Sequence, residues 1–377
     1  MIQTIRNAWK VQELRNKLLF TLFALLIFRV GAAIPVPFVN TKVLASYMAQ
    51  QSASIFSLLN VMSGDAFAQA TVFALGIQPY INSSIIIQLL TIAIPALERM
   101  ARDEGEEGKK KIASITRYAT IIIAIIQSFG YYTLIKSYGV LAVTGVWPAF
   151  VIIAAFTAGS AFLMWLGEQI TEFGIGNGIS IILFGGIVAR FPSLISTMIS
   201  SVRNWANGAT GDNVLTLHPA FIALVVIGVL ALVVFIVFIT NAERRIPVQY
   251  AKRVVGRKMY GGQSTHIPIK VNMSGVMPII FAQAIASIPA TIGMFVPSAS
   301  VKGSGWYNFL RVFDSSGLVY SIVYFLLIVL FSYFYNTIQF NPVEVANNLK
   351  KNGGFIPGFR PGKPTTDFLQ RVISRIT

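Results

Sequence analysis

Long apolar runs of about 20 residues recur along this 377-residue chain, separated by short polar stretches, and they constrain its fold more than any other feature. A helix needs about 20 such residues to cross the roughly 30 Å hydrocarbon core of a bilayer. Charged residues make up only 12% of the chain and hydrophobic residues 55%, whereas soluble domains carry about 25% charged residues. The sequence therefore predicts an all-α, polytopic membrane protein with little room for a separate soluble domain.

The predicted spans number eight, and the basic residues orient them. The first run follows a basic flank, as in a signal peptide, but seven further runs favour a spanning helix. With a cytoplasmic N-terminus, 23 of the 30 Lys and Arg residues fall in cytoplasmic segments, which the positive-inside rule favours. The spans are 18–34, 72–96, 112–136, 147–166, 178–200, 219–240, 273–296 and 317–339.

A short apolar segment, 55–62, precedes the second predicted span and breaks at Ser63-Gly64-Asp65. Eight helical residues rise only about 12 Å, so this segment cannot cross a bilayer. Backbone that breaks at membrane depth is tolerated only inside protein or against a water-filled cavity. The pattern predicts a re-entrant element that feeds into a spanning helix.

Several classes of chemistry find no support in the sequence. The chain has no cysteine, and its two histidines, His218 and His266, stand beside prolines and are expected in a turn or at a helix start. Arg29 and Arg190 lie near the outer ends of their spans, so ion-coupled transport is not expected. No nucleophile–base set or metal cluster is apparent. We therefore expect neither enzymatic activity nor a cofactor.

Two predicted cytoplasmic loops, 241–270 and 340–364, are more basic than orientation requires. The first carries seven basic residues interleaved with tyrosines and could contact RNA phosphates; orientation combined with anionic-lipid contact explains the bases equally well. Lys350 and Lys351 are expected on a short helix, and the glycines and prolines of 353–362 predict a shaped surface loop. The loop 167–177 contains three glycines, but no strand precedes it and no Lys follows, so it does not match a nucleotide-binding motif.

Aliphatic pairs stand four residues apart at the start of two predicted spans. Ile77 and Ile81 begin the second span, and Ile179 and Leu183 begin the fifth. Residues spaced in this way share a helix face. From spacing alone, packing or lipid contact is the favoured role for these pairs.

Four long motifs resemble the SecY/Sec61-alpha family, and specifically SecY, the channel subunit of the bacterial Sec translocon. They follow the family's order along the chain: ALGIQPYINSSIIIQLL (74–90), LGEQITEFGIGNGISIILFGGIVA (166–189), QSTHIPIKVNMSGVMPIIFA (263–282) and NPVEVANNLKKNGGFIPGFRPGKPT (341–365). The resemblance implies a clam-shell of two inverted helical halves around a pore. The family has ten spanning helices, so eight are expected here and the last two are expected to be lacking. Phe38 stands where the family usually has glycine.

The resemblance also implies domain boundaries: an amphipathic cytoplasmic segment 1–17, an N-terminal half 18–200 with a plug at 54–67, a C-terminal half 201–339 with the basic loop 241–270, and a cytoplasmic loop 340–377.

Functional residues follow by motif. The implied pore ring consists of Ile77, Ile81, Ile179, Leu183 and Ile280. The implied plug includes Ile55, Phe56, Leu58, Leu59, Asn60, Met62 and Gly64. The implied lateral gate includes Gln88 and Asn272, and the implied ribosome and SecA docking residues are Lys252, Arg253, Arg257, Lys258 and Arg360.

The implied function is translocation of unfolded polypeptides across the membrane and their lateral release into lipid. The expected partners are SecE, SecG, the SecA ATPase or the ribosome with its RNA, a secretory or nascent polypeptide, and membrane lipids. The expected location is the cell (plasma or inner) membrane. A polytopic secondary transporter of small solutes is the alternative, because such carriers also use inverted repeats and broken helices; an integral membrane enzyme is a third possibility, disfavoured by the lack of a catalytic constellation.

Overall fold

The chain forms two compact units, seen here in a computed structural model. We call them unit 1, Met1–Thr197 with Ala284–Val323, and unit 2, Met198–Gln283 with Tyr324–Thr377. The structure describes residues 9–50, 60, 63–102, 105–207, 217–250, 253–255, 258–260, 264–293, 295, 305 and 317–376. The division predicted at residue 200 stays a prediction.

Unit 1 is built from helices whose ends follow local sequence signals. Pro79 stands in the first turn of α5, where its missing N–H costs no hydrogen bond. Asn177 caps α9, and its side chain accepts hydrogen bonds from the backbone N–H groups of Ile179 and Ser180. The helices are α2 (Gln12–Gly31), α3 (Thr41–Gln50), α5 (Gln78–Ala93), α6 (Pro95–Arg102), α7 (Gly105–Ser137), α8 (Val146–Phe173), α9 (Gly178–Val188) and α13 (Ile288–Gly293), while α10 (Phe191–Ala206) begins in unit 1 and continues into unit 2.

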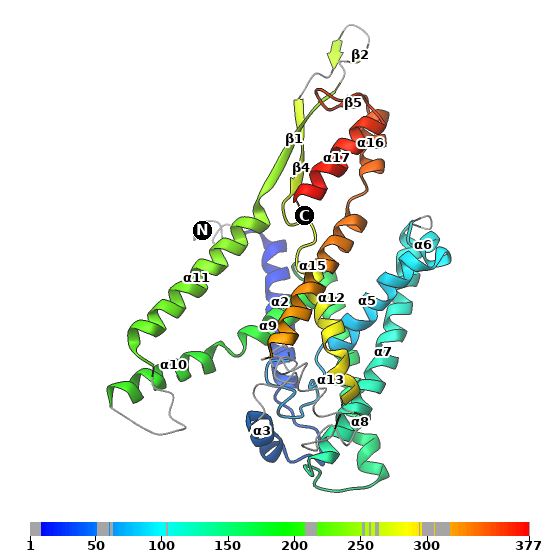
Figure 1. Cartoon of the computed structure of the whole chain (residues 1–377). Helices are drawn as coiled ribbons and strands as arrows, with labels where there is room; N and C mark the ends of the chain where they lie inside the picture. Colours follow the sequence, from blue (N-terminus) through cyan, green and yellow to red (C-terminus); the bar gives the residue numbers. More distant parts are fainter. Residues whose placement is uncertain are drawn as a thin grey trace. The chain divides into compact units, whose positions relative to one another are not determined.

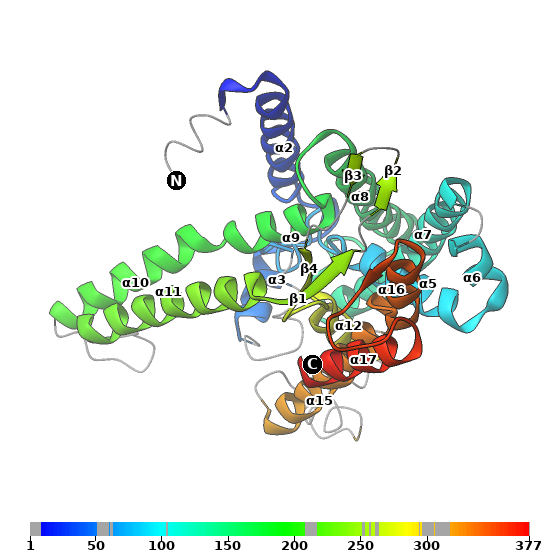
Figure 2. The ribbon, with the colours of Figure 1, turned by 90° about the horizontal axis from the view of Figure 1, so that it is seen from above.

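Helices α5, α7 and α8 lie side by side in unit 1 (Figures 1 and 2). Helices α7 and α8 share a core with the chain around Val36 and Phe67; it includes Tyr131, Ile135, Ile152 and Phe156, all fully buried. Small residues allow backbones to approach closely. A Cβ at Gly178 of α9 would lie 2.0 Å from the carbonyl oxygen of Gly167 in α8, so these two helices pack through glycine, as membrane helices commonly do.

Two of the predicted boundaries in unit 1 are wrong. The second span was expected over 72–96, but α5 begins at Gln78, and the chain bends by 106° between Gln78–Ala93 and Pro95–Ala101. Pro95 disfavours helical geometry at the residue before it, which explains the break. The loop expected at 167–177 is helical as far as Phe173, and Glu168 within it pairs with Arg117 of α7 at 2.8 Å.

An irregular layer, residues 32–40 and 63–77, connects these helices. The two segments of this layer are joined by backbone hydrogen bonds. The N–H of Val36 donates to the O of Ala70 (3.0 Å), and the N–H of Val72 donates to the O of Ile34 (2.9 Å). Phe38, where the resemblance led us to note a missing glycine, has φ +67°. This left-handed backbone is disfavoured for bulky residues, which is the physical reason that glycine suits the position.

Unit 2 contains helices and a small sheet. Its helices are α11 (Pro219–Asn241), most of α12 (Met277–Ala286), most of α15 (Leu318–Gln339), α16 (Pro342–Lys351) and α17 (Lys363–Ile376). The side chain of His218 caps α11 by accepting a hydrogen bond from the N–H of Ala220, which confirms the prediction that it starts a helix. His266 instead lies within a strand, so its predicted place in a turn or helix start is wrong.

The segment 241–270, expected as a loop, contains strands. β1 (Glu243–Tyr250) pairs antiparallel with β4 (Ser264–Lys270), in register from Glu243↔Lys270 to Gln249↔Ser264. The short strand β5 (Gly354–Phe355) joins the other edge of β1. A hairpin of β2 (Arg253–Val255) and β3 (Lys258–Tyr260) extends beyond this sheet (Figure 1). Alternating burial in β1, with Ile246 and Val248 inward, explains why the segment forms a strand.

The segment after α15 is likewise more ordered than a loop. Helix α16 confirms the short helix expected at Lys350 and Lys351. The glycines at 353, 358 and 362 have φ between +69° and +106°, which confirms the shaped turn. Helix α17 packs its buried face, including Leu369 and Val372, into one core with Ile246, Val248 and Leu349.

The predicted eight spans are not confirmed as a number. Within the described residues, five helices are long and apolar enough to cross a membrane, or six if the bent pair α5 and α6 is one span. They are Gly105–Ser137, Val146–Phe173, Gly178–Ala206, Pro219–Asn241 and Leu318–Asn336. The span predicted at 273–296 divides into α12 and α13, each too short to cross by itself.

Candidate functional site

Three of the five predicted pore-ring residues lie close together in unit 1: Ile77 and Ile179 beside Gly167, and Leu183 across a pocket that Ile77 also lines. Ile77 ends the irregular layer as the N-cap of α5, and Ile179 lies in the first turn of α9. Atoms of both side chains lie 3.5 Å from the position that a Cβ on Gly167 would occupy. Ile77 and Leu183 together line a single pocket. Ile77 is therefore a neighbour of the second aliphatic pair, which begins 102 residues later in the sequence.

The other two ring residues are placed less directly. Ile81 lies one turn beyond Ile77 in α5 and is buried, with 6% of its surface exposed. Ile280 is half-buried on α12, in unit 2. Its part in the ring stays a prediction.

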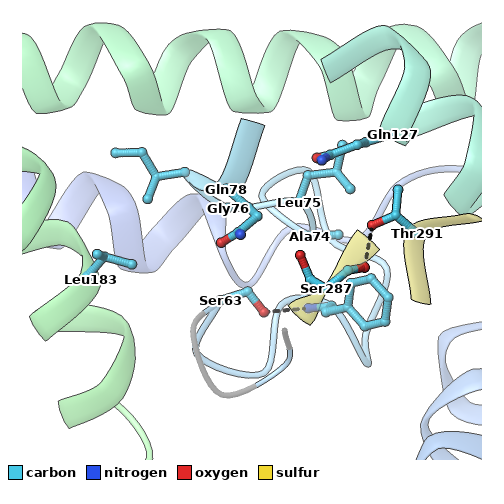
Figure 3. A pocket seen from close by; sticks show the side chains of 11 residues that line it. Ser63, Ala74, Leu75, Gly76, Gln78, Gln127, Leu183, Ser287 and Thr291 are labelled. Atoms are coloured by element: carbon cyan, nitrogen blue, oxygen red, sulfur yellow. Dashed lines mark hydrogen bonds between the residues drawn. The ribbon is translucent and has the colours of Figure 1, made fainter. Parts of the chain in front are cut away.

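The pocket beside these residues is mixed in character (Figure 3). Its volume is about 30 Å³, which is enough for a water molecule. Aliphatic side chains of Ile77, Leu75 and Leu183 share its lining with hydroxyl and amide groups. The polar members of the lining are Ser63, Gln78, Gln127, Ser287 and Thr291.

Gln78 contributes the least satisfied polar atom of this pocket. Its side chain points into the pocket (Figure 3) and is 8% exposed. Its Nε2 donates to Asn82 Oδ1 at 3.3 Å, while its Oε1 is buried and has no hydrogen-bond partner among the described residues. A buried acceptor of this kind costs free energy unless a donor reaches it. The pocket can therefore bind a small hydrogen-bond donor beside the aliphatic side chains.

The predicted plug is described only at its C-terminal end. Ile55, Phe56, Leu58, Leu59 and Met62 lie outside the described residues, as does the predicted short apolar helix. Asn60 and Gly64 are described, and Asn60 folds the turn that follows it: its Oδ1 accepts from the N–H of Ala68 at 2.8 Å and its Nδ2 donates to Asp65 Oδ1 at 2.9 Å.

The chain beyond that turn is fixed to α7 and α8. The ring of Phe67 stacks on Tyr131 with centroids 4.4 Å apart, and the hydroxyl of Tyr131 donates to the carbonyl of Phe67. Ser160 of α8 donates to the carbonyl of Gly76 at 3.2 Å. The irregular layer, whose backbone hydrogen bonds form no regular ladder, is thus also anchored to α7 and α8 by side chains.

The predicted lateral-gate residues lie in different units. Gln88 is half-buried on α5 in unit 1. Asn272 precedes α12 in unit 2, where its Oδ1 accepts from the N–H of Gly275 at 2.9 Å. Their common role as a gate stays a prediction.

The predicted docking residues belong to the sheet region of unit 2. Lys252 and Arg257 lie outside the described residues. Arg253 and Lys258 occupy the β2–β3 hairpin, opposite Tyr260 and Val255. Arg360 is exposed in the turn between β5 and α17. One folded body therefore presents basic residues from both predicted cytoplasmic loops.

Sequence reasoning missed this union of the two loops. The alternation of Ile246, Val248 and Tyr250 is a strand signal that could have revealed β1. The pairing of β1 with β5, about 100 residues later, has no local signal. Within the described ranges, no group of three or more histidine and acidic side chains could hold a metal ion.

Comparison with known proteins places the chain in one family. A family model described as SecY matches residues 71–377. The protein translocase subunit SecY of Mycobacterium tuberculosis is 43% identical over 393 residues, which covers 100% of this chain and 86% of that relative. The Escherichia coli subunit of the same name is 44% identical over 370 residues, which covers 97% of this chain and 81% of that relative.

Solved structures show the same fold. A structure titled as that of a protein conducting channel has a TM-score of 0.62 at 19% identity, covering 96% of this chain and 82% of that one. Sec61 in a canine ribosome-channel complex has a TM-score of 0.61 at 18% identity, covering 96% of this chain and 81% of that one.

Proposed function

The chain belongs to the SecY family, and we propose that it conducts unfolded polypeptides through a pore closed by an aliphatic ring and a plug. It is a multi-span membrane protein and a protein translocase subunit. The family match rules out the small-solute carrier that the composition had left as an alternative. The relatives are named as channel or translocase subunits and not as enzymes.

The observation that carries the proposal is the convergence of Ile77, Ile179 and Leu183 beside the irregular layer. Flexible aliphatic side chains can contact a passing chain without sequence preference, because they make no directional bonds. When no polypeptide is present, an apolar constriction dewets and opposes ion flow. Ile81 and Ile280 complete this ring in the proposal.

The plug, 54–67, ends ten residues before the first ring residue, Ile77, in sequence. In the proposal, a polypeptide that passes the ring displaces the plug. Gln88 and Asn272 supply neutral polar groups to the lateral gate, where they weaken the closed seam enough for an apolar signal sequence to compete with it.

The sheet region of unit 2 is the proposed docking body. Arg253, Lys258 and Arg360 stand on it, and Lys252 and Arg257 belong to the same hairpin segment. A ribosome would be bound through RNA phosphates, and the SecA motor through Arg360. The name of the Sec61 relative, solved in a ribosome-channel complex, supports a ribosomal partner. SecE and SecG are the proposed companion subunits in the cell membrane, with the N-terminus cytoplasmic.

Reconstitution of the complete complex in vesicles tests the proposal. A secretory precursor should become protected from added protease when SecA and ATP are supplied. A precursor that stays protease-sensitive while a small solute accumulates would reject the channel.

A second measurement tests the ring. Glycine at Ile77, Ile81 and Ile280 should raise the resting ion conductance in planar bilayers, because the constriction is widened and wetted. The matched control places glycine at Ile86, Ile92 and Ile279, which lie on the same two helices but are 44–47% exposed. Equal conductance in both triple variants would contradict the ring assignment.

A further inference from the structure

Two arginines that the ring and the docking body do not use converge on one turn of unit 1. Arg29 lies in the last turn of α2, and Arg190 lies between α9 and α10. Arg29 Nη1 donates to the carbonyl oxygen of Gly64 at 3.2 Å. Arg190 Nε lies 3.3 Å from Asp65 Oδ1. Adjacent residues of the turn are therefore held from two different helical elements.

The turn itself is built to present these acceptors. The N–H of Asp65 donates to the carbonyl of Asn60 at 3.0 Å, and Asn60 Nδ2 donates back to Asp65 Oδ1. Asp65 has φ +71°, a left-handed conformation that residues with a side chain adopt at a cost. Aspartate is among the residues that tolerate it, because its carboxylate can bond locally. Strained residues of this kind cluster at sites where the strain serves a function.

The turn also lies directly against α9. Gly64 has φ +64°, and a Cβ on it would lie 3.0 Å from the carbonyl oxygen of Gly186. Gly64 is buried, whereas the side chains of Asp65 and Arg190 are 35% and 32% exposed. The ion pair therefore lies at the exposed edge of a turn whose Gly64 is buried against α9.

The contacts of Arg29 and Arg190 fall at a critical place in the sequence, between the start of the proposed plug and an anchored segment. Residues 67–77 on one side are fixed by Tyr131 and Ser160. The plug, 54–67, contains the turn and ends at the anchored Phe67. Gly64 and Asp65 therefore connect the preceding residues of the plug to the fixed part of the chain.

We infer that Arg29 and Arg190 form a clamp on Gly64 and Asp65 that positions the plug and sets how readily it leaves the pore. This inference rests on the proposed role of 54–67 as a plug. Arg29 acts on a main-chain carbonyl and Arg190 on a carboxylate, so the two arginines contribute separately. All four residues are positioning residues.

Resting ion conductance of the reconstituted complex measures the clamp. Asp65→Asn and Arg190→Gln should each raise it by about two- to fivefold, the population shift expected from losing a partly exposed ion pair. The double variant should leak no more than either single variant, because both remove the same interaction. Arg190→Lys keeps the charge and should stay near the unaltered protein. Arg29→Met should multiply the effect of Asp65→Asn.

The matched control is Glu168→Gln, which breaks the 2.8 Å pair with Arg117 in the same unit but away from the turn. It should leave resting conductance unchanged. Independent, multiplying effects of Asp65→Asn and Arg190→Gln would overturn the clamp, as would conductance unchanged in both.

Deletion of 55–62 separates the two levels of the inference. If the deletion leaves resting conductance unchanged, the proposed plug is wrong. If the deletion raises conductance and the ion-pair variants do not, the plug stands and the clamp alone is wrong.

Discussion

The irregular layer of unit 1 and the sheet of unit 2 solve the same problem in opposite ways. Both must satisfy backbone polar groups outside helices. In the sheet, β1 and β4 satisfy each other through a continuous ladder. In the layer, isolated backbone hydrogen bonds, such as that from Val36 to Ala70, are combined with separate side-chain partners, among them Asn60, Tyr131 and Ser160. The hydrogen bonds of a ladder form and break cooperatively, whereas backbone that is anchored at separate positions can be released one contact at a time.

This difference suits the proposed roles of the two regions. A docking body must keep its shape while a partner pushes on it, and a cooperative sheet with its own core does so. A plug must leave and return without unfolding the helices around it. Separate side-chain anchors allow this, because each is worth only about 1 kcal/mol.

The largest effect that separates the two regions is expected from Leu369→Ala. Leu369 is 0% exposed in the core of the sheet region. Its truncation should lower the local stability of unit 2 by about 2–5 kcal/mol, because it leaves a cavity. Hydrogen exchange should accelerate in β1 and β4 and not in α7. Val343→Ala, at a 54% exposed position on α16, is the control and should change little. Acceleration confined to α16 would show that the sheet does not share this core.

A smaller effect is expected in the layer from Gly159→Ala. A Cβ on Gly159 of α8 would lie 2.0 Å from the carbonyl oxygen of Val72, and backbone cannot yield as a flexible side chain can. We expect a loss of stability of about 1–3 kcal/mol, measured by thermal unfolding of the purified complex, with a rise in resting conductance. Gly228→Ala in α11, where nothing lies within 4 Å, is the matched control and should be neutral or stabilising. Equal behaviour of the two variants would contradict the close seating of the layer on α8.

The smallest effect is expected at Phe38, where the comparison of two variants measures the energetic cost of the backbone conformation. Phe38→Gly and Phe38→Ala both remove the ring, so their difference reports the φ of +67° alone. The glycine variant should be more stable than the alanine variant by about 1 kcal/mol, as measured by chemical denaturation. At Val146, in the first turn of α8, the order should reverse, because alanine is favoured in a helix. If the alanine variant at position 38 is as stable as the glycine variant or more stable, the backbone at Phe38 is not strained.

Much of the helical pattern could be predicted because its signals are local. The 20-residue apolar runs predicted α7, α8, α11 and α15, and Pro79 and Asn177 explain where α5 and α9 begin. Prediction failed where a signal was weak or competed with another. Pro95 broke the second span, and the alternation in β1 was hidden within a strongly basic segment.

The candidate site could be predicted only in part, and mainly through resemblance. Spacing alone favoured a packing or lipid-facing role for Ile77 and Ile179. Their approach around Gly167 depends on how α5, α8 and α9 pack. Asp65 and Arg190 are 125 positions apart and have no shared local pattern, so their pairing was invisible in the sequence.

The sequence by itself determined that this chain is a multi-span helical membrane protein with basic segments between its spans, because hydrophobicity and charge act residue by residue. Only the tertiary structure decided which neutral and charged groups meet: the aliphatic side chains around Gly167, the two arginines on the turn at Gly64 and Asp65, and the two basic segments joined in one sheet. Such meetings are set by backbone approach and packing between distant segments, which no local pattern encodes.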